Sequence, residues 1–290
     1  GCPDPDPTYE RFFNPRRNHY STDLDPIGYD YIDALKNEVR KWLKRIPATD
    51  PVGCCFSGGI DSGAVLVSVY RALVDSGQSP SRLKAFTLAV DGGGADVEQA
   101  RTFLSRLDLE MLLEVIDVPA DRLDPLEAVE VIEDYKPLDI QSGAMTMALC
   151  RGIRERYPHW KHLVDGDGGD ENLKDYPIEA NPELTIRSVH SNSMLYHEGW
   201  GVDAIKHSLT FSGGLSRGVT RGYAPTSQLG FSCFSPFMLR DVITVAEGIP
   251  FVELTDWDHQ KLYDLKGEIV SRGVESITGT HMPVFEKRRF

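Results

Sequence analysis

A glycine- and serine-rich stretch, Ser57–Gly63, follows the apolar run Val52–Phe56. Adjacent glycines let a backbone approach an anion closely, while successive N–H groups, a helix N-terminus and serine hydroxyls supply donors and partial positive charge. The stretch has no lysine and matches neither GxxxxGK[ST] nor GxGxxG. It therefore predicts a strand–loop–helix unit that binds a pyrophosphate group. The alternative is a plain glycine turn capped by Asp61 and Ser62.

Carboxylates are the second chemical signal. Asp61 beside a polyphosphate is repulsive unless a divalent cation lies between them, so the sequence predicts Mg²⁺ bound by Asp61 and phosphate oxygens. A second glycine-rich loop, within Leu163–Tyr176, crowds four carboxylates, which are Asp165, Asp167, Asp170 and Glu171. Like charges at this density repel one another unless a cation lies among them, so these carboxylates are predicted to be further metal ligands. The alternative is a calcium-type or solvated acidic loop, although the EF-hand spacing is absent.

Both loops resemble motifs of one enzyme superfamily. SGGIDS is similar to the SGGxDS motif of the PP-loop ATP pyrophosphatases, which cleave ATP to AMP and pyrophosphate. GDGGDE resembles the GxGxDE loop of the asparagine synthetase C-terminal domain. Ser235–Pro250 resembles that family's PFLD segment and the helix after it, with Met238 and Leu239 where the family usually has Leu-Asp.

Three further points extend this resemblance over nearly the whole chain. Residues 136–142 resemble the DxxS stretch that precedes the family's acidic loop. Lys287 and Phe290 stand in the positions of its closing K-x-x-F. The similarity runs from about Tyr31 to Phe290, so we expect a synthetase domain without the family's N-terminal glutaminase domain.

The resemblance implies a nucleotide site and a metal site. In that family the glycine loop holds the pyrophosphate part of ATP, adenine lies against the ends of two strands, and two aspartates bind Mg²⁺. The implied nucleotide-binding residues are Cys55, Phe56, Ser57, Gly58, Gly59, Asp61, Ser62, Phe86, Thr87, Leu88 and Gly166, and the implied metal ligands are Asp61 and Asp170.

The resemblance implies two catalytic residues, Lys287 and Asp167, and the spacing of two arginines adds Arg221 as a third candidate. Lys287 matches the lysine that stabilises charge on the transferring phosphate, the alternative being a solvated basic tail. Asp167 holds the position that assists the amine or the acyl intermediate. Glutamate is typical there of asparagine synthetases and tyrosine of the β-lactam-forming branch, so aspartate argues against β-lactam closure. Arg221, one helical turn from Arg217, would face the phosphates or a carboxylate substrate, or else both arginines are exposed.

The elements that must position these residues alternate along the chain. Buried-strand patterns occur at Val52–Phe56, Leu83–Val90, Leu112–Val118 and His162–Val164, with helical patterns between them and before the first. This alternation predicts an α/β fold, a doubly wound parallel sheet of the PP-loop or HUP-like kind, with ligands beyond the carboxyl ends of the strands. Beyond Tyr176 strand signals fade, which predicts a mainly helical C-terminal layer. The predicted parts are a proline-rich segment (1–27), a nucleotide-binding core (28–176) and a helical part that completes the synthetase site (177–290).

Composition limits the partners. The chain has 290 residues and a formal net charge of −13, from 31 Lys and Arg against 44 Asp and Glu, which argues against nucleic acid. Its apolar runs are far shorter than the roughly 18 residues of a membrane-spanning helix. The first residues lack a signal-peptide pattern, so we expect a cytoplasmic protein without a membrane partner. The five cysteines contain no CxxC pair, so neither a zinc site nor a disulfide framework is indicated.

Together these features predict an ATP-dependent, AMP-forming carbon–nitrogen ligase. A small carboxylate would be activated as an acyl-adenylate with release of pyrophosphate, and the acyl group would pass to ammonia or an amine. The nitrogen would come from free ammonia, a separate glutaminase subunit or an amine substrate. A homo-oligomeric state is left as an alternative to a monomer. One alternative is a sulfur-transferring or tRNA-modifying PP-loop enzyme, which usually needs a cysteine pair and a basic surface. Another is an inactive nucleotide-binding relative, which Asp167, Met238 and Leu239 leave open.

Overall fold

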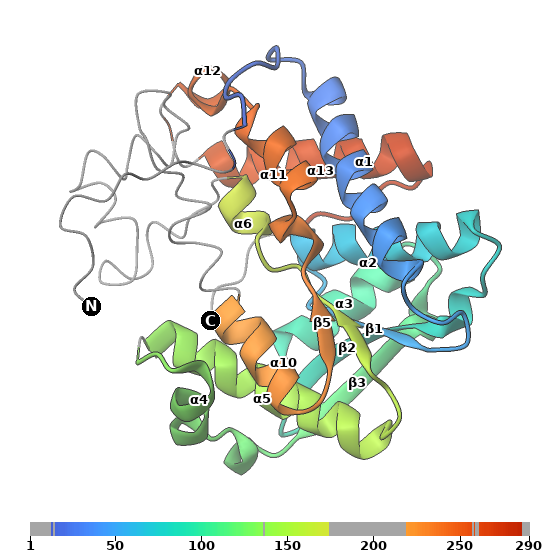
Figure 1. Ribbon diagram of the computed structural model, residues 1–290, viewed down its shortest axis with the longest axis vertical. Coiled ribbons are helices and arrows are strands. Elements are labelled where there is room, and N and C mark those ends of the chain that lie inside the picture. Colours follow the sequence, from blue (N-terminus) through green and yellow to red (C-terminus); the bar gives the residue numbers. More distant parts are fainter. Residues whose placement is uncertain are drawn as a thin grey trace, which may run out of the picture.

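The centre of the molecule is a five-stranded parallel sheet with strand order β3-β2-β1-β4-β5 (Figure 1). The computed structural model describes residues 13, 15–135, 137–173, 219–256, 258 and 261–285. The strands are β1 (Val52–Cys55), β2 (Leu83–Val90), β3 (Leu113–Val118), β4 (His162–Val164) and β5 (Ser232–Phe234). The order reverses direction between β1 and β4, and ligands of open α/β sheets bind beyond the carboxyl ends of strands at such a reversal.

Helices cover both faces of this sheet, which confirms the doubly wound α/β fold (Figure 1). One face carries α1 (Leu24–Leu43), α2 (Ile60–Asp75), α3 (Ala95–Ser105), α11 (Arg240–Glu247) and α13 (Leu262–Thr278). The other carries α5 (Pro137–Arg156), against which α4 (Pro125–Ile132) and α10 (Ala224–Gln228) pack. Two short helices, α6 (Gly169–Asn172) and α12 (Phe251–Thr255), complete the described set.

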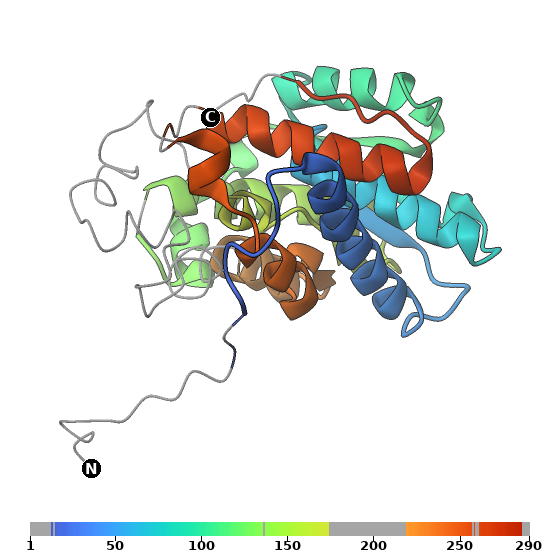
Figure 2. The same cartoon turned by 90° about the horizontal axis from the view of Figure 1, so that it is seen from above.

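The first and the last of these helices, α1 and α13, pack backbone to backbone, and Figure 2 shows them side by side. A Cβ on Gly28 would lie 2.6 Å from the backbone oxygen of Ile269, and a Cβ on Gly273 would overlap the backbone oxygen of Gly28. Only glycine permits this separation. The contact fixes α13 against α1, and both helices also contact α2.

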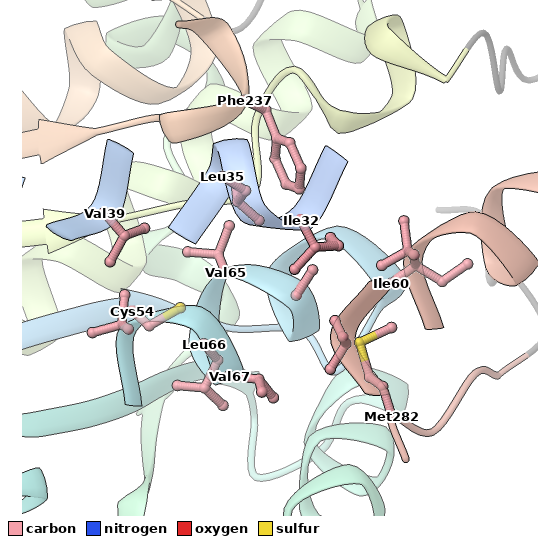
Figure 3. Packing of buried hydrophobic residues seen from close by; sticks show 14 of the residues in the cluster. Ile32, Leu35, Val39, Cys54, Ile60, Val65, Leu66, Val67, Phe237 and Met282 are labelled. Atoms are coloured by element: carbon pink, nitrogen blue, oxygen red, sulfur yellow. The ribbon is translucent and has the colours of Figure 1, made fainter. Parts of the chain in front are cut away.

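A continuous apolar core holds the loop after β1 in place. Figure 3 shows Ile32 and Leu35 of α1 packed toward Val65 of α2, with Cys54 of β1 beneath them. Met282, which follows α13, lies in the same cluster and is fully buried. Because both β1 and α2 are anchored in this core, the segment between them is held at both ends.

The observed elements match the sequence expectations closely, with one addition. The four predicted strands are present, and the helical stretch before β4 forms α4 and α5. The sequence did not predict β5, which pairs in parallel with β4 at the edge of the sheet. Its three residues are only half-buried or exposed, too short a run to show a strand pattern. In the part of the chain that the structure describes, no helix combines the length and apolarity needed to cross a membrane.

Candidate active site

Two loops meet beyond the carboxyl ends of β1 and β4. The strands pair in register, with Val52 beside His162 and Cys54 beside Val164. A Cβ on Gly166, in the loop after β4, would lie 2.8 Å from the backbone nitrogen of Ser62. The two glycine-rich segments identified in the sequence therefore touch at the reversal point of the sheet.

The loop after β1 presents donors at the start of α2. Gly58 has φ 77°, and a Cβ there would lie 2.7 Å from the backbone nitrogen of Ala100. The Ser57 and Ser62 hydroxyls lie 3.2 Å apart, and the Gly59 N–H donates to Ser57 Oγ at 3.3 Å. These bonds are long, and the first amides of α2 lack intrahelical partners. Such hydroxyls and amides can turn to an anion at little cost, as a phosphate site requires.

A buried lysine lies between the two aspartates predicted to bind metal. Lys266 Nζ donates to Asp61 Oδ2 at 2.6 Å and also pairs with Asp170 Oδ1. The Lys266 side chain is only 2% exposed, so water screens its charge little and the two carboxylates stabilise it strongly. Sequence reasoning missed Lys266. The available signal was a lone lysine on the apolar stripe of α13, four residues after Leu262 and three before Ile269.

The donor set of Asp61 and Asp170 fits Mg²⁺. Both carboxylates converge on a single ammonium, so oxygens from two elements are within reach of one cation. Gly169 lies so close that a Cβ there would overlap the Asp61 carboxylate. Hard oxygen ligands of this kind suit Mg²⁺, which usually takes one or two carboxylates and completes its shell with phosphate and water.

Asp165 and Asp167 lie at the end of β4 and hold their protons more tightly than usual. The Asp167 N–H and the Cys233 thiol both donate to the Asp165 carboxylate, at 3.1 Å each. Burial raises the pKa of Asp165, although hydrogen bonds from Ser235 and Cys233 oppose the shift. Burial and the negative charge of Asp165 raise the pKa of Asp167 well above its usual range. Asp167 is therefore able to accept or release a proton nearer neutral pH than an ordinary carboxyl.

A π-helical turn, Val219–Tyr223, brings Arg221 to these carboxylates. The Arg221 guanidinium lies 3.8 Å from Glu171 Oε1 and 4.0 Å from Asp139 Oδ1, and its side chain is 22% exposed. A Cβ on the next residue, Gly222, would overlap the Asp167 carboxylate. Arg221 is thus not an exposed arginine, and π turns often occur at functional sites. Glu171 was predicted among the carboxylates of the second loop, whereas Asp139 was not among the predicted site residues.

The implied adenine region lies at the ends of β1 and β2. Cys55 pairs with Phe86, and the Phe56 N–H donates to the Phe86 carbonyl at 2.8 Å. Thr87 Oγ1 donates to the Phe56 carbonyl at 2.6 Å. Phe56 and Phe86 are buried in the core, whereas Cys55 and Leu88 are half-buried. The structure brings these residues together, but the two aromatic rings pack against protein.

Two of the predicted cationic residues, Lys287 and Arg217, lie outside the residues that the structure describes. Their roles remain predictions. The structure thus groups the following predicted residues at one edge of the sheet: Ser57, Gly58, Gly59, Asp61, Ser62, Gly166, Asp167, Asp170, Glu171 and Arg221. It adds Lys266 and Asp139.

Comparisons with known proteins place this site in a family. Among curated proteins, no sequence matches the chain. Among solved structures, the U34-tRNA thiolase NcsA from Methanococcus maripaludis, with its [4Fe-4S] cluster, matches over 88% of this chain and 81% of that chain, at 18% sequence identity and a TM-score of 0.37. That likeness is too distant to assign chemistry. The family model for asparagine synthase matches residues 32–217, which include both glycine-rich loops. Since this match covers well over half of the 290 residues, the chain belongs to the asparagine synthase family.

Proposed function

We propose that the protein is an ATP-dependent, amide-forming synthetase. It activates a small-molecule carboxylate as an acyl-adenylate, releases pyrophosphate and transfers the acyl group to a nitrogen nucleophile. The observation that carries this proposal is the contact between the donor-rich loop after β1 and the acidic loop after β4. Membership of the asparagine synthase family supports an ATP-using, adenylating enzyme of the PP-loop type.

The first half-reaction uses the edge formed by Ser57–Ser62. A carboxylate oxygen of the substrate attacks the α-phosphorus, and the bond from that phosphorus to the departing pyrophosphate oxygen breaks. The loop after β1 binds the leaving pyrophosphate through amides and hydroxyls. Asp61 and Asp170 would hold Mg²⁺, which supplies charge neutralisation to the phosphates when bound. Lys266 and Lys287 supply further positive charge.

The second half-reaction requires a base for the nucleophile. The nitrogen attacks the acyl carbon, AMP departs, and the nitrogen loses a proton. Asp167 accepts that proton in our proposal, because its pKa is raised by burial and by Asp165. Arg221, beside Glu171 and Asp139, stabilises the acidic surroundings in which this transfer takes place.

Sulfur transfer is the weaker candidate function. It would require a nucleophilic thiolate, and burial raises the pKa of Cys150 to about 12. Burial also raises the pKa of Cys55 and Cys233 well above the usual range, and nearby negative charge adds to both shifts. These three thiols are therefore protonated at neutral pH. They behave as core residues rather than nucleophiles.

Product analysis tests the proposal. Purified protein would be incubated with ATP, Mg²⁺, a panel of carboxylic acids and a panel of amines, and the products would be separated by anion-exchange chromatography. We expect acid-dependent formation of AMP and pyrophosphate in equal amounts. Asp167→Asn should still release pyrophosphate in a single turnover but lose the formation of AMP, because Asp167 acts only in the transfer step. Asp121→Asn, an exposed control, should retain both. Products of ADP and phosphate would overturn the proposal, and ATP binding without acid-dependent turnover would favour a nucleotide-binding relative.

A further inference from the structure

Asn172 is the last residue of α6, the single helical turn that carries Asp170. It is fully buried, and a buried amide is normally satisfied by hydrogen bonds. Asn172 Nδ2 donates to the Phe237 carbonyl at 2.8 Å and to the Tyr31 hydroxyl at 3.3 Å. Both hydrogens of the amide are therefore used, and they join the loop after β4 to two other elements.

The Phe237 carbonyl fixes the orientation of this amide. A carbonyl can only accept, so the Asn172 amide must direct its nitrogen toward Phe237. Figure 3 shows the Phe237 ring directed toward α1, where it stacks on the Tyr31 ring with the centroids 5.8 Å apart. Asn172 thus connects α6 to segments that lie 141 positions before it and 65 positions after it in the sequence.

The short helix α6 depends on these contacts for its position. It has four residues and follows Gly168, whose φ is 96°. A helix this short is unstable by itself in water, so packing against other elements must hold it. A Cβ on Gly168 would lie 3.3 Å from the Phe237 Cβ and 3.1 Å from the Met238 Cγ, so the start of α6 packs on the same turn that accepts the Asn172 amide.

Tyr31 connects this hydrogen-bonded group to the predicted metal ligands. Burial raises the pKa of Tyr31, the hydrogen bond from Asn172 opposes the shift, and the charge of Asp61 adds to it. Lys266 and Asp170 act on the same hydroxyl, in opposite directions. The hydrogen bonds of Asn172 therefore lie near the two aspartates, on elements that pack directly against α6.

We propose that Asn172 is a positioning residue for the magnesium site: it fixes α6 on Tyr31 and Phe237 and thereby places the Asp170 carboxylate opposite Asp61. This inference rests on the proposed function, which makes Asp170 a ligand of Mg²⁺. Asn172 acts through α6 and not by contact with the cation. Groups that orient metal ligands in this way typically change metal affinity by roughly 10- to 100-fold when they are removed.

Titration calorimetry of the full chain with ATP, in Mg²⁺ and in EDTA, tests this role. Asn172→Leu removes the amide and keeps a side chain of similar length. We expect its ATP affinity in Mg²⁺ to fall roughly 10- to 100-fold, while its ATP affinity in EDTA changes little. Tyr31→Phe removes one hydroxyl and keeps the ring, so affinity in Mg²⁺ should fall only about 2- to 10-fold.

Thr255→Val is the matched control. It removes another buried polar group, a hydroxyl that donates to the Phe251 carbonyl within α12. Urea unfolding gives the loss of stability in each variant. We expect Thr255→Val to lose stability and to keep the parental response to Mg²⁺, which separates positioning of the metal ligand from a general weakening of the fold.

Several outcomes would overturn the inference: a parent protein whose ATP affinity does not depend on Mg²⁺, an Asn172→Leu variant that responds to Mg²⁺ like the parent, equal losses in Mg²⁺ and in EDTA, or an equal loss in Thr255→Val. Tyr31→Phe carries the test if Asn172→Leu fails to fold.

Product analysis separates the positioning role from the proposed function. Mg²⁺-dependent ATP binding that requires Asn172, without AMP from any acid, would reject only the synthetase. Parental formation of AMP in Asn172→Leu, with the parental requirement for Mg²⁺, would reject only the positioning role.

Discussion

The loop after β1 and the loop after β4 have the same place in the fold and opposite electrical character. Each follows a buried strand, contains two or more glycines and opens a helix, and the two strands are neighbours in the sheet. The first loop offers amides, two hydroxyls and one carboxylate, Asp61. The second carries four carboxylates between Asp165 and Glu171. The parallel sheet fixes where a ligand binds, while side-chain type decides the sign of the charge that each loop accepts.

Neither Ser57–Ser62 nor Asp165–Glu171 contains a lysine or an arginine. The cations beside them come from remote elements: Lys266 of α13 contacts both loops, and Arg221 of the π-helical turn lies beside the second. The α1–α13 glycine contact explains how a residue more than 200 positions after Asp61 reaches it. The site therefore depends on the C-terminal elements for positive charge. The loops after β1 and β4 supply the amides, hydroxyls and carboxylates.

The largest expected effect concerns a cation that neither loop supplies. Lys287→Ala should lower turnover by on the order of 10²-fold or more, because an ammonium that stabilises developing charge on the α-phosphate acts mainly in the transition state. ATP affinity should change little. Steady-state kinetics and ATP titration would separate the two effects.

Lys287→Arg should rescue little, since a forked guanidinium does not replace a compact charge. Arg289→Ala is the matched control from the same basic run. If Lys287→Ala turned over like the parent protein, the required cation would have to be Lys266 or Arg221.

Asp61→Ala tests the single carboxylate of the first loop. We expect ATP binding to lose its dependence on Mg²⁺ and to weaken by about 10- to 100-fold, since one of two protein ligands is removed. Lys266 would retain Asp170 as a partner. Isothermal titration with and without Mg²⁺ measures the change, and Asp121→Ala is an exposed control. An unchanged response to Mg²⁺ would show that Asp61 serves only to hold Lys266.

The sequence predicted the two loops well because each is a short local pattern. Strand, glycines and polar residues stand together there, and the buried-strand runs before them are clear. Lys266 and Asp139 were missed as site residues because their roles depend on long-range packing. Lys266 lies on an otherwise apolar helix face, and only the contact of α13 with α1 and α2 reveals its partners. β5 was missed because three partly exposed residues carry no periodicity.

Gly58→Ala would break the first loop through its backbone. A side chain there meets both positive φ and the backbone of Ala100, so we expect a loss of about 1–3 kcal/mol in the free energy of unfolding together with weaker ATP binding. Gly77→Ala is a close control, because Gly77 has φ 70° with nothing within 4 Å of an added Cβ. Urea unfolding should show a smaller loss for Gly77→Ala, and its ATP binding should be normal. Equal losses in both variants would show that the contact with Ala100 is unimportant.

The smallest expected effect comes from the second loop and depends on pH. The pKa of Asp167 is raised in the folded protein, so the folded state holds this proton more tightly than the unfolded state. Protonated Asp167 contributes fully to the free energy of unfolding below the pKa that it has in the unfolded chain, which is about 4. This contribution is lost as the pH rises through the higher pKa of the folded state. Asp167→Asn, which cannot ionise, should therefore gain stability relative to the parent as pH rises, by on the order of 1 kcal/mol.

The contribution of Asp75 to stability should depend on pH in the opposite direction, which Asp75→Asn tests. A hydrogen bond from Lys36 lowers the pKa of Asp75, so its contribution is present above the unfolded pKa and is lost as pH falls. Because this pair lies near the surface, Asp75→Asn should cost at most about 1 kcal/mol at neutral pH. Urea unfolding of the parent and both variants at pH 3.0, 5.5 and 8.5 gives the comparison, because the Asp75 effect should change between the two lower values and the Asp167 effect between the two higher ones. If Asp167→Asn tracked the parent at the two higher pH values, Asp167 would be an ordinary solvated carboxylate, and the base for the incoming amine would have to be sought at Asp165 or Glu171.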